Sequence, residues 1–238
     1  MLEANTILVE ADQLTISTHE IGRYAGGSRY KLDEKMKVLA CDMLAEAKTL
    51  VEPAFTYAVH AVASIDSQKG LQLKRGSYLE VPLEEKDPQT VSLAAVVCTL
   101  GPQLEDKTHR LMQQGELLTA MFLDAAGVAQ LEKLAHTARQ HIKAKVAKNG
   151  QFTGCPFGPG YNDMPLDAQT SLFDHVDAKG IGVRLNQSGV MLPMKSISFW
   201  LRVTRDKKAA EDHGYKCQKC DMENCLYRKV PYLIEDEV

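Results

Sequence analysis

Helical and strand-like patterns alternate along this chain, and that order constrains its fold more than any other feature. The longest helical pattern covers residues 116–148, which are rich in alanine and carry apolar side chains every three or four positions. Further helical patterns lie at 20–26, 33–50, 103–114 and 166–176. Strand-like patterns lie before, between and after them, at 6–10, 55–65, 78–81, 91–100 and 180–204. This interleaving predicts an α+β fold with a mainly antiparallel sheet flanked by helices.

The domain organisation follows from the absence of any linker-like stretch. We expect residues 1–205 to form a single α+β domain, and residues 206–238 to form a cysteine-rich metal-binding tail packed on it. The glycine- and proline-rich residues 154–165 are expected to form an irregular loop.

Charge and hydropathy exclude two broad classes of protein. The net charge is −3 and no long basic run is present, which argues against nucleic-acid binding. The longest apolar run, at 91–100, is about half of the roughly 20 residues that a membrane-spanning helix needs. Acidic residues interrupt the N-terminal segment before a signal-type apolar stretch develops. We therefore expect a cytoplasmic protein with no membrane partner.

The C-terminal segment carries three cysteines at metal-ligand spacing. Cys217, Cys220 and Cys225 form a C-x-x-C-x-x-x-x-C arrangement, in which the first two thiolates can chelate one centre from a tight turn. Thiolates suit both zinc and iron–sulfur clusters, so the ligand type alone leaves both open. Zinc would make the tail a structural knuckle, and a cluster would make it an electron carrier.

A four-coordinate site needs one more ligand. Cys155 is the best candidate because it belongs to the expected loop and is followed by Pro156, as in ferredoxin cluster motifs. His213, four residues before Cys217, is the rival. Cys41 and Cys98 lie within apolar segments and are expected to be small buried residues.

Other polar residues give weaker signals. His60 is expected to be a satisfied core residue, and His136 and His141 to be surface residues. Lys195 and Arg184 are candidates for binding anions, although ordinary surface positions fit them equally well. Motifs of hydrolases, kinases and dinucleotide-binding proteins are missing from the sequence, so no catalytic residue is assigned.

The stretch 158–200 resembles the activation (reactivation) domain of cobalamin-dependent methionine synthase. The matching elements, in chain order, are Pro159-Gly160-Tyr161, Gln169, Leu172-Phe173, Ile181 to Leu185, Met191 to Pro193, and Ser196 to Ser198. The segments 123–135 and 20–27 also look similar to free-standing members, so that the resemblance covers most of the chain.

The resemblance implies a fold and a function. The family has one α+β domain that binds S-adenosylmethionine along an Arg-x-x-x-Gly-Tyr loop, which here would comprise Gly158, Pro159, Gly160 and Tyr161. It packs on a corrinoid domain while cob(II)alamin is reduced and remethylated, with electrons from an external donor. Pro156 stands where the family has arginine, which predicts weak or absent S-adenosylmethionine binding.

Together these features predict a reductive activator of a corrinoid (vitamin B12) protein or cobalamin-dependent methyltransferase. It would help return Co(II) to Co(I), with an iron–sulfur cluster, [4Fe–4S] rather than zinc, as electron relay. The alternatives are a non-catalytic corrinoid-protein-binding module with a structural zinc site, and a reactivation domain that uses S-adenosylmethionine.

Overall fold

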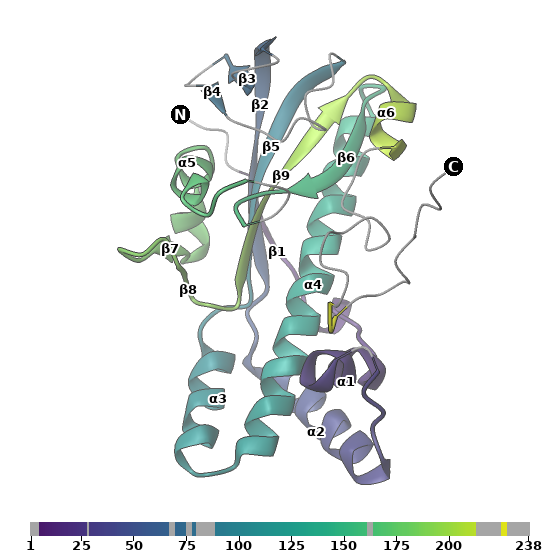
Figure 1. Ribbon diagram of the computed structural model, residues 1–238, viewed down its shortest axis with the longest axis vertical. Coiled ribbons are helices and arrows are strands. Elements are labelled where there is room, and N and C mark those ends of the chain that lie inside the picture. The colour runs from purple at the N-terminus through teal and green to yellow at the C-terminus, as the bar shows by residue number, and fades with distance from the viewer. Residues whose placement is uncertain are drawn as a thin grey trace, which may run out of the picture.

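The computed structural model describes residues 5–27, 29–66, 70–74, 78–79, 89–160, 164–212 and 225–227. Its centre is an antiparallel sheet with strand order β4-β3-β2-β5-β9-β6, and β1 pairs separately with β2 (Figure 1). The strands of this sheet are β1 Asn5–Leu8, β2 Ala54–Asp66, β3 Gly70–Leu73, β4 Tyr78–Leu79, β5 Thr90–Thr99, β6 Phe152–Phe157 and β9 Ser196–Thr204. A small hairpin is made by β7 Arg184–Leu185 and β8 Met191–Leu192.

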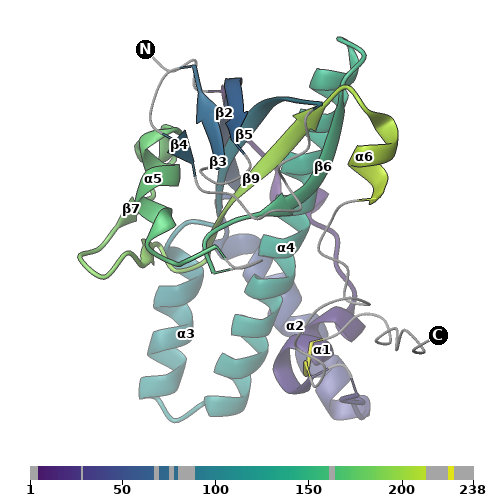
Figure 2. The same ribbon diagram turned by 45° about the horizontal axis from the view of Figure 1, so that its top comes forward.

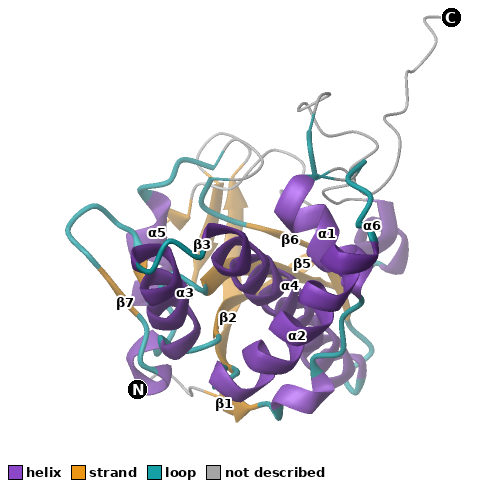
Figure 3. Ribbon diagram, turned by 90° about the horizontal axis from the view of Figure 1, so that it is seen from below, coloured by secondary structure: helices purple, strands orange, loops and turns teal. Residues whose placement is uncertain are grey.

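The helices divide between the two faces of the sheet. On one face lie α1 Thr18–Gly26, α2 Glu34–Leu50, α3 Gln103–Gln113 and the long α4 Leu117–Ala147. The short α5 Ala168–Asp174 and the 3-10 turn η3 Ala178–Ile181 cover the other face, and α6 Lys207–Asp212 packs against β6 and β9 (Figures 1 and 3). The α+β class with a mainly antiparallel sheet is thereby confirmed.

Local sequence explains where the helices begin and end. Asp33 caps α2, because its Oδ1 accepts a hydrogen bond from the Met36 amide at 2.8 Å. Ser17 and Glu20 form a capping box at the start of α1. Gly115 separates α3 from α4 with a φ of 81°, a conformation that other residues rarely adopt. None of the described helices is both long and apolar enough to cross a membrane.

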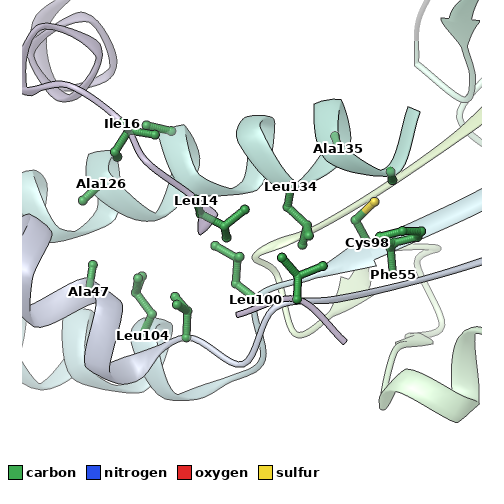
Figure 4. Packing of buried hydrophobic residues seen from close by; sticks show 14 of the residues in the cluster. Leu14, Ile16, Ala47, Phe55, Cys98, Leu100, Leu104, Ala126, Leu134 and Ala135 are labelled. Atoms are coloured by element: carbon green, nitrogen blue, oxygen red, sulfur yellow. The ribbon is translucent and has the colours of Figure 1, made fainter. Parts of the chain in front are cut away.

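A hydrophobic core lies on each face. The larger one joins α1, α2, α3 and α4 to one face of β2, β5 and β9, and Figure 4 shows Leu134 of α4 entering the same layer as Phe55 and Cys98. The smaller one lies between the other face and α5, with Trp200 and Leu172 at its centre. Successive residues of β9 therefore serve different cores, as the alternation of side chains along a strand requires.

The fold corrects two expectations from the sequence and adds short elements that its patterns did not indicate. Residues 154–157 are not an irregular loop, because they form most of β6. Cys41 is exposed rather than buried, since the stripe of α2 that packs inward contains Ala40, Met43 and Ala47. The sequence patterns also missed β3 and α6, which are short.

Candidate functional site

The turn that leaves β6 is the candidate site. Among the described strands, β6 lies at the edge of the sheet, where a proline is tolerated because its missing N–H is not needed by a neighbouring strand on that side. Pro156 pairs with Leu201 of β9, and the register shifts between Thr153 and Pro156. Such an irregularity at an edge strand redirects the side chains that follow it.

Two glycines shape this turn. Gly158 passes so close to β9 that a Cβ there would lie 3.2 Å from the Phe199 Cα and 3.4 Å from the Ser198 oxygen. Gly160 has a φ of 82°, and its amide donates to the Met164 carbonyl at 2.9 Å. Gly158 and Pro159 are buried and Gly160 is exposed, so the main chain turns outward here. Tyr161, the fourth predicted cofactor-binding residue, lies outside the described residues.

Buried polar groups of β9 and α5 lie among the apolar side chains on this face of the sheet. The Ser198 hydroxyl donates to Gln169 Oε1 at 3.2 Å, and both side chains are buried. This bond joins β9 to α5, and Gly158 of the turn lies close to the Ser198 main chain. Trp200 Nε1 is buried and has no hydrogen-bond partner among the described residues. A buried donor of this kind costs free energy unless a water or ligand accepts from it.

Two histidines surround Trp200. The ring centroids of His60 and His175 are 5.1 Å apart and their planes meet at 89°, and the centroids of His175 and Trp200 are 5.5 Å apart. His60 Nε2 donates to the His175 carbonyl at 2.7 Å, which confirms His60 as a satisfied core residue. Burial lowers the pKa of His60, and the charge on His175 lowers it further against the opposing effect of that hydrogen bond.

The structure places two of the four predicted thiol ligands. Cys155 lies in β6, and Cys225 lies in the short segment beside α1; both are partly exposed. Cys217, Cys220 and the rival ligand His213 lie outside the described residues. Within the described ranges, no group of three or more His, Cys, Asp or Glu side chains could hold a metal ion. The four-cysteine site therefore stays a prediction.

The other residues that the sequence singled out lie in environments typical of structural or surface side chains. Lys195, the residue before β9, forms an ion pair with Asp124 of α4, with 2.6 Å between Nζ and Oδ1. Arg184 is exposed on β7. His136 and His141 are exposed on α4, as predicted, although the His141 ring also contacts Phe55.

Sequence reasoning missed two buried arginines that contact the C-terminal segments. Arg202 of β9 is fully buried and donates through Nη2 to the Ala209 carbonyl of α6 at 2.8 Å. Gly154 makes room for it, because a Cβ there would lie 3.2 Å from Arg202 Nε. Arg23 of α1 donates through Nη1 to the Tyr227 carbonyl at 3.0 Å. No local pattern marks either arginine, since each is defined by contacts between distant segments.

Comparison with known proteins supports the fold. No protein-family model matches the chain, and no curated protein matches it significantly. Among solved structures, 13 chains match, including one described as the "Crystal Structure of the MetH Reactivation Domain bound to AdoHcy". The TM-score is 0.59 at 13% identity, with 87% of this chain and 80% of that chain covered.

The chain shares the fold of the MetH reactivation domain. This likeness extends over 87% of the chain. At such low identity it concerns the fold alone.

Proposed function

We propose that this protein is a reductive activator of a corrinoid protein. The observation that carries the proposal is the reactivation-domain fold over 87% of the chain. The turn at 158–160, in which Gly158 lies against the main chain of Ser198 and Phe199 and Gly160 is exposed, supplies a shaped main-chain surface for the partner to contact. The reaction is the addition of one electron to Co(II) of the partner's corrinoid, giving Co(I), with the electron coming from an external donor.

An activator of this kind must bind one state of its partner more tightly than another. A protein that binds the Co(II) and Co(I) states equally shifts nothing, however strong the complex. We infer that the turn at 158–160 makes the contact that distinguishes the states. The chain itself contains no Asp-x-His-x-x-Gly motif for carrying a corrinoid, so the corrinoid belongs to the partner.

The proposed electron relay is an iron–sulfur cluster, [4Fe–4S], held by Cys155, Cys217, Cys220 and Cys225. A bound cluster would supply one-electron transfer at low potential. Thiolates are the appropriate donors, and the partial exposure of Cys155 and Cys225 suits a site that receives electrons from outside. Zinc at the same cysteines is the alternative, in which case the protein would be a non-catalytic module that binds the corrinoid protein.

The deciding experiment combines metal analysis with a reduction assay. The protein is purified anaerobically, assayed for iron, acid-labile sulfide and zinc, and mixed with a candidate corrinoid protein and a low-potential reductant. We expect iron and sulfide, and a faster or more complete appearance of the Co(I) absorbance. A Tyr161→Ala variant should remain folded and lose much of this effect. Stoichiometric zinc without iron would overturn the relay, and unchanged Co(I) formation would overturn the activator.

A second candidate function is a reactivation domain that uses S-adenosylmethionine. It is favoured by one observation, that the similar solved structure is bound to AdoHcy. The glycines of the turn are present in this chain, but Pro156 supplies no cation for the ligand's carboxylate. A binding titration with S-adenosylmethionine separates the two candidates.

A further inference from the structure

A buried arginine on α1 holds the segment that contains Cys225. The Arg23 side chain is 8% exposed, although arginine is usually a surface residue. Its Nη1 donates to the Tyr227 carbonyl at 3.0 Å and its Nη2 to the Tyr24 hydroxyl at 2.8 Å. Glu132 of α4 lies 3.6 Å from Nη2 and offsets the charge. Contacts with Tyr24 of α1 and Glu132 of α4 therefore orient the guanidinium toward the Tyr227 carbonyl.

Tyr24 of α1 and Gly27, the residue that follows this helix, complete a docking surface for Leu226 and Tyr227. The rings of Tyr24 and Tyr227 stack with centroids 5.9 Å apart and an angle of 28° between them. Gly27 approaches so closely that a Cβ there would lie 3.2 Å from the Leu226 carbonyl oxygen. Figures 1 and 2 both show this short segment, drawn in yellow, against α1. These three contacts hold Leu226 and Tyr227, the two residues that follow Cys225.

The cysteine-bearing part of the chain is thus held at both ends. Before it, in α6, the Ala209 carbonyl accepts a hydrogen bond from Arg202 at 2.8 Å, and at its end the Tyr227 carbonyl accepts one from Arg23 of α1. Both bonds are charge-assisted and both are made to main-chain oxygens, so they fix backbone position regardless of the side chain present. Fixing the backbone on each side lowers the entropy cost of bringing ligands to one centre.

We infer that Arg23 is a positioning residue for Cys225, acting through the carbonyl of Tyr227, two residues further along the chain. This inference rests on the metal site of the proposed function. A purely structural role would be limited to packing α1 against α4, where Arg23 meets Glu132. Weakening only the contact with Tyr227 should expose Cys225 if Arg23 positions it, and should leave Cys225 unchanged if Arg23 only packs α1 against α4.

The first test needs no metal. The full-length apo protein is reduced and alkylated with iodoacetamide, and the rate at Cys225 is followed by peptide mass spectrometry. In Arg23→Gln and Tyr227→Ala we expect Cys225 to react about 10-fold faster, the change that follows from losing one charge-assisted bond or the ring stack. Arg23→Lys should restore part of the protection. Tyr227→Phe is the matched control, because it keeps the carbonyl and the ring, and should react like wild type.

The second test uses the protein reconstituted with iron and sulfide. Release of iron to a chelator should be about 10-fold faster in Tyr227→Ala than in Tyr227→Phe or wild type. Equal alkylation rates in all variants, or faster alkylation with unchanged iron release, would overturn the positioning role. If wild type takes up no iron, the relay fails on its own, and the alkylation rates still decide whether Arg23 holds Cys225. Because Tyr227 lies outside both cores, its variants remain informative if Arg23→Gln does not fold.

Discussion

Gly158, the residue after β6, lies against the backbone of Phe199 in β9: a Cβ there would come within 3.2 Å of the Phe199 Cα, which is tighter than nine in ten Cβ contacts in proteins. The contacted atoms are main chain, which cannot rotate away. The turn at 158–160 is therefore positioned by direct contact between β6 and β9.

Replacing this glycine should consequently move the turn. We expect Gly158→Ala to lower the free energy of unfolding by about 1–3 kcal/mol, the usual cost of overpacking. Denaturant unfolding followed by circular dichroism measures this. Leu166→Ala is the control, since Leu166 lies beside the same turn but is 60% exposed, and it should change stability little. Equal stability of Gly158→Ala and wild type would mean that β6 can shift freely.

Wild-type protein should bind S-adenosylmethionine weakly or not at all, because Pro156 provides no partner for the ligand's carboxylate. Pro156→Arg should raise the affinity by about 10- to 100-fold, the value of one charge-assisted hydrogen bond. Isothermal titration calorimetry gives the dissociation constants of wild type and of Pro156→Arg. Pro156→Gln separates the effect of the charge from that of removing the proline. Micromolar or tighter binding by wild type would restore the S-adenosylmethionine function.

Cys155→Ser should weaken the proposed cluster, since an alcohol is a poorer ligand for iron than a thiolate. We expect a lower iron and sulfide content and a less intense brown colour after anaerobic purification. Cys41→Ser is the matched control, because Cys41 is exposed on α2 and has no proposed ligand role. An unchanged cluster in Cys155→Ser would transfer the fourth-ligand role to His213 or to an external ligand.

Acidification should destabilise the protein partly through His60. Its pKa is lowered in the folded state, chiefly by burial, so the unfolded chain binds a proton at higher pH than the folded one. The contribution to stability is complete above the unfolded pKa of about 6.5 and is lost as the pH falls from there toward the folded pKa.

Unfolding free energies at pH 7.5 and 5.5 test this effect. His60→Gln should lose less stability than wild type over that interval. His141→Gln is the comparison, because burial lowers the pKa of His141 in the same direction but on the other face of the sheet. The fluorescence of Trp200, the only tryptophan, reports the change locally, since its ring contacts both His60 and His175. If the unfolding free energies of His60→Gln and wild type changed equally with pH, His60 would not be a source of the acid sensitivity.

The sequence by itself determined the long helices and the central strands. Periodicity is a property of neighbouring residues, so the apolar repeat of α4 and the alternation in β2 could both be recognised without knowledge of the fold. The resemblance around 158–200 likewise indicated the fold class that the comparison with solved structures supports.

Only the tertiary structure decided the details of the site. The run Gly154-Cys155-Pro156 has the composition of a loop, and it becomes a strand because β9 offers an edge on which a proline is tolerated. Cys41 and Cys98 occur in similarly apolar segments, yet only Cys98 faces a core, because burial depends on which side of an element meets its neighbour. The bond from Arg23 to Tyr227 joins residues 204 positions apart, and contacts of that range leave no local pattern in the sequence.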